Sequence, residues 1–120
     1  MLSENLKILL ATSYAFVIKV QNFHWNVEGS DFPQYHSFFD DLQGEVYDNA
    51  IDRTAEYIRT LEAYTPGSIT RYAELSLIPD QLKIPKAHLM FAELYRDNEI
   101  IIEHLNECYD ISEAAKQYGI

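Results

Sequence analysis

The chain has 120 residues, with 19 Asp and Glu against 9 Lys and Arg, so its formal net charge is −10. That length fits a single domain over residues 1–120, and a hydrophobic content of 48% argues against a disordered chain. The negative balance argues against a broad nucleic-acid-binding face, which needs clustered Lys and Arg, and it suits cationic partners instead.

Cysteine usage and hydropathy indicate a cytoplasmic protein. The single cysteine, Cys108, cannot form a disulfide within the chain, so a reducing compartment is the default. The longest apolar runs, such as residues 8–11 and 100–102, are too short to cross a bilayer. The N-terminus lacks a basic region followed by a long apolar stretch, so we expect no signal peptide.

Helical periodicity begins near the N-terminus and predicts a first helix over residues 3–27. Ser3 is placed to cap its start, and Gly29 is placed to end it. The apolar residues fall mostly on one stripe: Leu6, Leu9, Leu10, Phe16, Val17, Val20, Phe23 and Val27.

A second helix is predicted over residues 33–64, from Pro33 in its first turn to the break at Pro66. Its apolar pattern slips in the middle. Phe38, Leu42 and Val46 form one stripe, but the next strong apolar positions are Ile51, Ala55 and Ile58. A shift of about one residue predicts a local π-bulge or a kink in this helix.

The rest of the chain predicts a short helix over residues 70–75, a third long helix over 85–107 and a short helical segment over 112–118. With no strand-like alternation, the fold class is all-α, an antiparallel helix bundle. Three long helices do not complete a four-helix bundle. We therefore expect a fourth helix that is truncated or supplied by another chain.

Two histidines and three carboxylates stand out as candidate metal ligands. His24 ends the first predicted helix, and His36 and Asp40 lie four residues apart near the start of the second. Asp52 and Glu56 are also four apart and share a face further along. Imidazoles with carboxylates suit Fe(II), Mn(II) or Zn(II).

The spacing of these groups separates them along one helix. Asp52 lies 16 residues beyond His36, which is roughly 24 Å of α-helix. The two groups can meet only if a two-fold contact runs two such helices antiparallel, so the spacing predicts a site shared between subunits. The alternative is that the histidines are caps or surface residues and that the acids form a solvated helix face.

The segment from His24 to Gly29, followed by Phe32 and His36, resembles the signature of the Dps family, the mini-ferritins. That family has HWN-x-x-G-x-x-F-x-x-x-H at this spacing. The later stretch Asp52-Arg53-Thr54-Ala55-Glu56 resembles its D-x-x-A-E segment, and residues 66–68 resemble the link that follows. The resemblance covers about residues 5–115 and is densest from 20 to 68.

The resemblance implies that His24, His36 and Asp40 bind iron from one subunit, while Asp52 and Glu56 come from the two-fold partner. It places Trp25 beside the iron, although a buried aromatic between helices would fit that position equally well. Family members oxidise Fe(II), usually with hydrogen peroxide, and store the ferric mineral inside a dodecameric shell. The resemblance therefore implies a ferroxidase that uses iron and forms a homo-oligomer.

Three features depart from that family. In that family the later Asp usually lies 15 positions beyond the second His, and in this chain Asp52 lies 16 positions beyond His36. A π-bulge would absorb the extra residue and still present Asp52 and Glu56. The chain stops at Ile120, where the family's fourth long helix should begin. It also lacks the Lys- and Arg-rich N-terminal arm with which some members bind DNA, since only Lys7 and Lys19 precede the motif.

Other residues have weaker claims to a chemical role. The acids Asp41, Glu45 and Asp48, and likewise Glu99, Glu103 and Glu107, form either a solvated face or the lining of a path for iron. We expect His88 and His104 to be structural or exposed, and Cys108 to be a small apolar filler. A second hypothesis is that the ferritin-like scaffold serves as a non-catalytic structural or interaction module.

Overall fold

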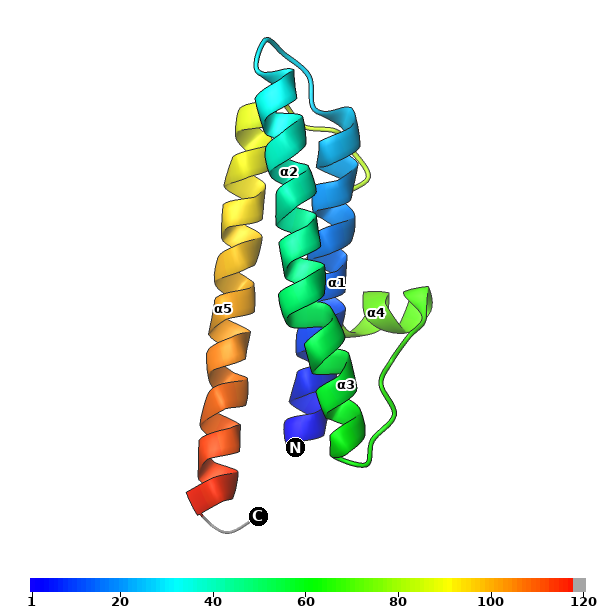
Figure 1. Cartoon of the computed structure of the whole chain (residues 1–120), viewed down its shortest axis with the longest axis vertical. Coiled ribbons are helices and arrows are strands. Elements are labelled where there is room, and N and C mark those ends of the chain that lie inside the picture. The colour runs from blue at the N-terminus through cyan, green and yellow to red at the C-terminus, as the bar shows by residue number, and fades with distance from the viewer. Residues whose placement is uncertain (118–120) are drawn as a thin grey trace.

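A computed structural model describes residues 1–117 of the chain, and within them every regular element is a helix. Figure 1 shows the arrangement, which confirms the all-α prediction. The elements in chain order are α1 (Leu2–Asn26), α2 (Phe32–Val46), the π-helical turn η1 (Tyr47–Ile51), α3 (Asp52–Thr60), α4 (Ile69–Leu75) and α5 (Ala87–Gln117). None of the helices in this described part is long and apolar enough to span a membrane.

Helix α1 is the centre of the molecule, because the other helices pack round it. Apolar side chains recur on it every three or four residues, so one broad stripe is removed from water. Its buried apolar residues are Leu9, Leu10, Ala11, Phe16, Val17, Val20 and Phe23. The predicted Ser3 cap is wrong: the helix begins one residue earlier, its N-cap is Met1, and no side chain caps it.

The second predicted helix is one continuous rod of α2, η1 and α3. Pro33 lies in its first turn, where a missing N–H costs nothing. The predicted π-bulge is confirmed at Tyr47–Ile51. The rod ends at Thr60 rather than at Tyr64, because Leu61 leaves helical geometry and Glu62 turns the chain with a φ of 60°.

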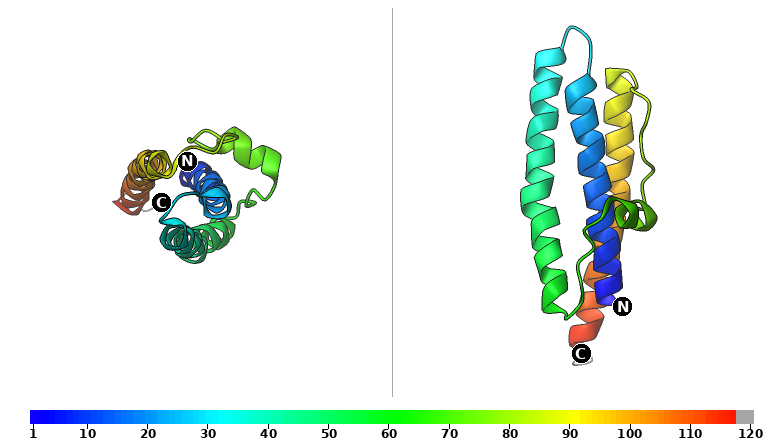
Figure 2. Two further views of the ribbon diagram at one scale, coloured as in Figure 1. Left: turned by 90° about the horizontal axis from the view of Figure 1, so that it is seen from above. Right: turned by 90° about the vertical axis from the view of Figure 1, so that its right-hand side faces the viewer.

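A connecting segment returns the chain across α1. Ser68 caps the start of the short α4 by accepting a hydrogen bond from the Arg71 backbone N–H at 3.2 Å. Further along, the Thr12 hydroxyl of α1 accepts a bond from the Leu77 N–H at 3.0 Å, which fixes the segment to the central helix. Figure 2 shows α4 projecting on the side of α1 opposite the long helices.

Helix α5 is longer than predicted. The expected break between residues 107 and 112 is wrong, since one helix runs from Ala87 to Gln117 and includes the predicted short segment as far as the described residues extend. Tyr118, the last residue of that predicted segment, lies outside them. Good helix formers such as Glu113 and Ala114 follow Ile111, and no Gly or Pro interrupts the run.

The core lies where α1 faces α2 and α5. Seen end on in Figure 2, α2 and α5 each lie beside α1. The main buried cluster joins Phe23 of α1, Phe39 of α2, and Met90 and Leu94 of α5. A second cluster, with Leu10, Ile51 and Ile58, continues the core toward the N-terminal end of α1. The described residues thus form three long rods and one short helix, as the sequence predicts.

Candidate metal centre

The short connection between α1 and α2 brings His24 and His36 face to face. Helix α1 stops because Val27 takes an extended conformation, and Gly29, with a φ of +114°, turns the chain back. The two imidazole rings then stack with their centroids 3.8 Å apart and their planes 22° apart. Phe32 covers the outer face of the His36 ring at a centroid distance of 5.0 Å.

Each of these histidines is held by the backbone of the other. The His24 Nδ1–H donates to the His36 carbonyl at 2.6 Å, and the His36 Nδ1–H donates to the His24 carbonyl at 2.7 Å. A carbonyl can only accept, so each Nδ1 carries the proton. In the neutral tautomer that these bonds select, each ring has its lone pair on Nε2, the atom that would bind a metal ion.

Asp40 supplies a carboxylate beside this histidine pair. Its Oδ1 lies 4.0 Å from the His24 Nε2. Two ligand atoms that each lie about 2.0–2.2 Å from one ion can be at most about 4.4 Å apart, so one ion could contact both atoms after a small movement of the carboxylate. The carboxylate is exposed whereas the His24 side chain is largely covered, so one ligand is fixed and the other can turn.

Asp52 and Glu56 lie on the same side of the α2–α3 rod as His36 and Asp40. Asp40 directly follows the buried Phe39, and Asp52 directly follows the buried Ile51, so each lies about 100° round the helix from a core residue in the same sense. Twelve α-helical residues from Phe39 to Ile51 would leave the second carboxylate about 120° out of step. The π-turn takes up that rotation.

The two groups of candidate ligands do not meet within one chain. Among residues 1–117, no group of three or more His, Cys, Asp and Glu side chains is placed to hold a metal ion. Asp52 and Glu56 are exposed on α3, beyond the π-turn from the histidines. Within the described residues of one chain, the candidate ligands therefore lie in two separate groups, which we call the half-sites; that they form one site across two chains stays a prediction.

Trp25 lies next to His24 at the end of α1 and is 64% exposed. The reading of this residue as a buried aromatic between helices is therefore wrong for the single chain. Ile18 precedes it by seven residues, which places both on one side of α1. Tyr14 lies on this side of α1 as well, and its ring contacts the ring of Tyr47 on the π-turn edge to face. These exposed apolar groups border the half-sites.

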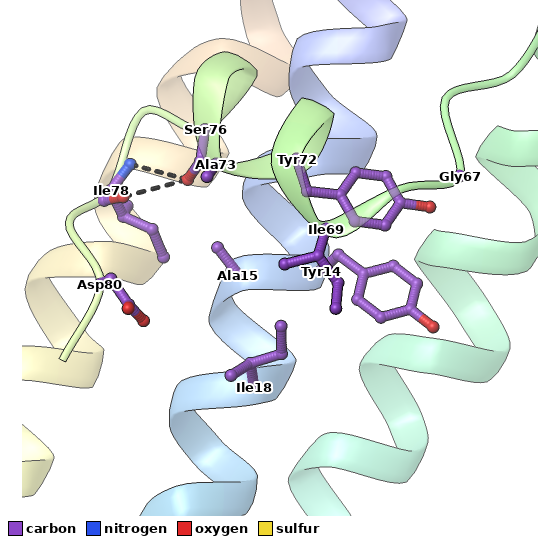
Figure 3. A pocket seen from close by; sticks show the side chains of 10 residues that line it. All are labelled: Tyr14, Ala15, Ile18, Gly67, Ile69, Tyr72, Ala73, Ser76, Ile78 and Asp80. Carbon is purple, nitrogen blue, oxygen red and sulfur yellow. Dashed lines mark hydrogen bonds between the residues drawn. The ribbon is translucent and has the colours of Figure 1, made fainter. Parts of the chain in front are cut away.

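A separate cavity of about 340 Å³ lies between α1 and the segment around α4. Figure 3 shows Tyr14 and Tyr72, whose rings stack at 4.8 Å, against one wall, with Ile18 and Ile69 nearby. Burial, together with the two neighbouring tyrosines, raises the pKa of the Tyr72 phenol. The lining offers Asp80 as its acidic group and no histidine, so this cavity is distinct from the ligand clusters.

The other residues that the sequence suggested for a chemical role lie on the surface or in the core. Asp41, Glu45 and Asp48 line an open acidic hollow with Asp40. His104 is buried and its Nε2–H donates to the Asn5 carbonyl at 2.8 Å, whereas His88 is exposed. Cys108 is buried as predicted.

Burial, reinforced by the charge of Glu107, raises the pKa of the Cys108 thiol, so this side chain is a packing residue and not a nucleophile.

Sequence reasoning missed one buried ion pair. The Lys19 Nζ lies 2.6 Å from the Asp97 Oδ2, and both side chains are 2% exposed. The pair joins α1 to α5 inside the main core. A charged residue within the apolar stripe of each helix was the available signal, because a buried charge requires a partner.

The sequence pattern of the ferritin-like domain family matches residues 3–120. The fold superposes on Dps from Staphylococcus aureus with a TM-score of 0.90 and 28% identity, over 96% of this chain and 76% of that one. The chain is a member of the Dps family of ferritin-like proteins. The predicted family resemblance is thereby confirmed.

Other proteins resemble this Dps-family chain in fold or in sequence. The Vibrio cholerae Dps protein, described as a member of a broad superfamily of ferritin-like diiron-carboxylate proteins, has the same fold at a TM-score of 0.92 and 23% identity, over 98% of this chain and 74% of that one. A low temperature-induced protein of Nostoc is 33% identical over 104 residues, or 86% of this chain. The match spans 58% of that relative's length.

Proposed function

We propose that this chain is a mini-ferritin subunit that binds Fe(II) as its substrate and oxidises it, with hydrogen peroxide as the oxidant, for iron storage and detoxification in the cytoplasm. The observation that carries the proposal is the reciprocal bonding of His24 and His36, which leaves both Nε2 atoms ready to bind a metal beside Asp40. The description of the Vibrio cholerae neighbour as a diiron-carboxylate protein supports iron as the metal.

The site is completed by Asp52 and Glu56 of a two-fold partner. The two half-sites lie on one side of the α2–α3 rod, with Asp52 16 positions beyond His36. A second copy running antiparallel would bring its α3 carboxylates to the histidines of the first and receive the reverse contact in return. The contact generates two equivalent sites, and it is the repeating unit from which a larger shell is built.

An apolar surface beside the half-sites favours this contact. Ile18, Trp25 and Tyr47 are respectively 46%, 64% and 43% exposed. Large apolar side chains gathered on one side of a small protein mark a protein–protein interface. Trp25 in particular would be covered by the partner and would then lie against the metal site.

Each ligand has a defined part in the reaction. The two imidazoles hold Fe(II) through neutral nitrogen, and the three carboxylates balance its charge and favour the ferric product. Five protein ligands shared between two ions leave open positions for peroxide, which accepts the electrons. The acidic hollow that contains Asp40 and Asp41 attracts Fe(II) toward the site.

The shared site is tested by mixing two defective proteins. The His24→Ala/His36→Ala and Asp52→Ala/Glu56→Ala variants each lose both sites, so ferric absorbance after adding Fe(II) and peroxide should rise at least about tenfold more slowly. Equal mixing gives mixed dimers in half of the pairs, and each mixed dimer has one intact site. The mixture should therefore recover about a quarter of the normal rate.

The matched control is Asp110→Ala/Glu113→Ala, which removes the same charge from exposed positions on α5 and should retain the normal rate. No recovery on mixing, with both parents folded and assembled, would rule out the shared site. Normal rates in both parents would rule out these five residues as the site. A rate for the unmodified protein no higher than that of Fe(II) and peroxide alone would favour the alternative, a ferritin-like scaffold that serves as a non-catalytic interaction module.

A further inference from the structure

Gln43 lies on the same side of α2 as the candidate ligands His36 and Asp40. It follows His36 by seven residues and Asp40 by three, which places it within about 20° of the first and about 60° of the second round the helix. The Gln43 side chain is half-buried, whereas the Asp40 side chain is exposed. A polar group with restricted freedom therefore lies beside a ligand that is free to turn.

The Gln43 amide holds the Asp40 carboxylate. The Gln43 Nε2–H donates to the Asp40 Oδ1 at 3.3 Å. This Oδ1 is the same atom that lies 4.0 Å from the His24 Nε2. An exposed side chain without such a bond exchanges between rotamers, so the amide favours the rotamer in which Oδ1 faces the histidine pair.

The chain offers a neutral group for this task. No Lys or Arg occurs between residues 20 and 52. The other side-chain amide that lines the acidic hollow belongs to Asn49, and its Nδ2–H donates to the Glu45 backbone carbonyl at 3.1 Å. Asp40 is thus oriented by an uncharged donor in surroundings that are otherwise acidic.

The neutrality of the donor has a consequence for metal binding. A Lys or Arg in its place would pair with the carboxylate and compete with an ion for the negative charge. An amide fixes the direction of Oδ1 and leaves the carboxylate charged, and a carboxylate oxygen can accept a hydrogen bond while it binds a metal. Ordering the side chain before the ion arrives also removes part of the entropy cost of binding.

We propose that Gln43 is a positioning residue of the metal centre, which presents the Asp40 carboxylate to a divalent cation bound by His24 and His36. This inference rests on the proposed function, because it requires Asp40 to be a ligand. Loss of a group that holds a metal ligand typically lowers metal affinity about 10–100-fold. Because this bond is exposed to water, we expect an effect at the lower end, about tenfold.

Calorimetric titration with Co(II) alone tests this role without redox chemistry, since Co(II) is the neighbour of Fe(II) in the affinity order of divalent metals. Gln43→Met keeps the length of the side chain and removes the donor, so the dissociation constant should rise about tenfold. Gln34→Met is the matched control, because it makes the same change at an exposed position on the opposite side of α2 and should leave the constant unchanged. Equal constants for the two variants would overturn the proposal.

A double-mutant cycle shows whether Gln43 acts through Asp40. In the Asp40→Ala background, Gln43→Met should cause no further loss of Co(II) affinity, because the carboxylate that it orients is gone. A comparable loss in that background would mean that Gln43 acts on the ion or on the fold directly, and would overturn the proposal.

The single variants of the ligands separate this inference from the proposed function. If Asp40→Ala leaves Co(II) affinity unchanged while His24→Ala lowers it, Asp40 is not a ligand and the role of Gln43 is wrong. If neither substitution changes the affinity, the proposed metal centre is itself wrong. If both lower it and Gln43→Met does not, the metal centre stands and only the positioning role fails.

Discussion

At the scale of single residues, we expect the Lys19–Asp97 ion pair to have a large effect on the free energy of unfolding. Both charges are almost completely buried, and their atoms lie 2.6 Å apart. The attraction between them offsets the free energy that each charge loses when it leaves water. Lys19→Met should lower the free energy of unfolding by about 3–5 kcal/mol, because it leaves Asp97 buried and unpaired. Urea unfolding followed by circular dichroism measures this loss.

Two further variants separate the pair from the general effect of losing a lysine. Lys7→Met breaks an exposed pair with Glu4 and should cost no more than about 0.5 kcal/mol. Lys19→Met/Asp97→Leu removes both buried charges and should regain most of the loss. If Lys19→Met costs no more than Lys7→Met, the buried pair is not formed.

Residue spacing alone led to part of the candidate site. His24, His36 and Asp40 could be selected from the sequence because helical spacing and a short loop bring them together. The exchange of ring–carbonyl bonds could not, because it depends on the exact path of residues 27–31. The partner of Lys19 was hidden for a different reason: Asp97 lies 78 residues away, and periodicity carries no information about which helix faces which.

At the scale of elements, the π-turn Tyr47–Ile51 decides the direction of α3. In an uninterrupted α-helix with one residue fewer between Phe39 and Ile51, these two side chains would point in directions only about 20° apart. The π-turn therefore compensates for one extra residue. Deleting Asn49, which is exposed, should therefore give a regular helix with Ile51 and Ile58 still buried. Its free energy of unfolding should match the parent within about 1 kcal/mol.

Deleting Thr54 is the matched control for that experiment. It lies beyond the π-turn, so its loss rotates Ile58 by about 100° out of the core and should cost about 2–4 kcal/mol. Similar losses from the two deletions in urea unfolding would mean that the π-turn itself is required.

The slip in apolar pattern predicted this π-turn, because the core positions on either side of it are strongly apolar. The continuity of α5 was not predicted, since the polar residues Asn106, Glu107 and Asp110 weaken the periodic signal while remaining compatible with a helix.

At the scale of the whole molecule, net charge determines whether the protein can bind a nucleic acid. A formal charge of −10, with Lys7 and Lys19 the only bases before His24 and Lys19 buried, opposes contact with a phosphate backbone. We predict no retardation of duplex DNA in a gel-shift assay at physiological salt. A complex that persists under those conditions would show that assembly creates a basic surface absent from the single chain.

The reciprocal bonds of His24 and His36 have a consequence for how this protein can change over evolutionary time. Each ring ties the end of α1 to the start of α2, so losing either one would loosen this connection as well as the proposed metal site. Asp52 and Glu56 are exposed and carry no such double duty. In relatives that no longer bind iron, those two carboxylates should be replaced first, while the histidines persist because they still join α1 to α2.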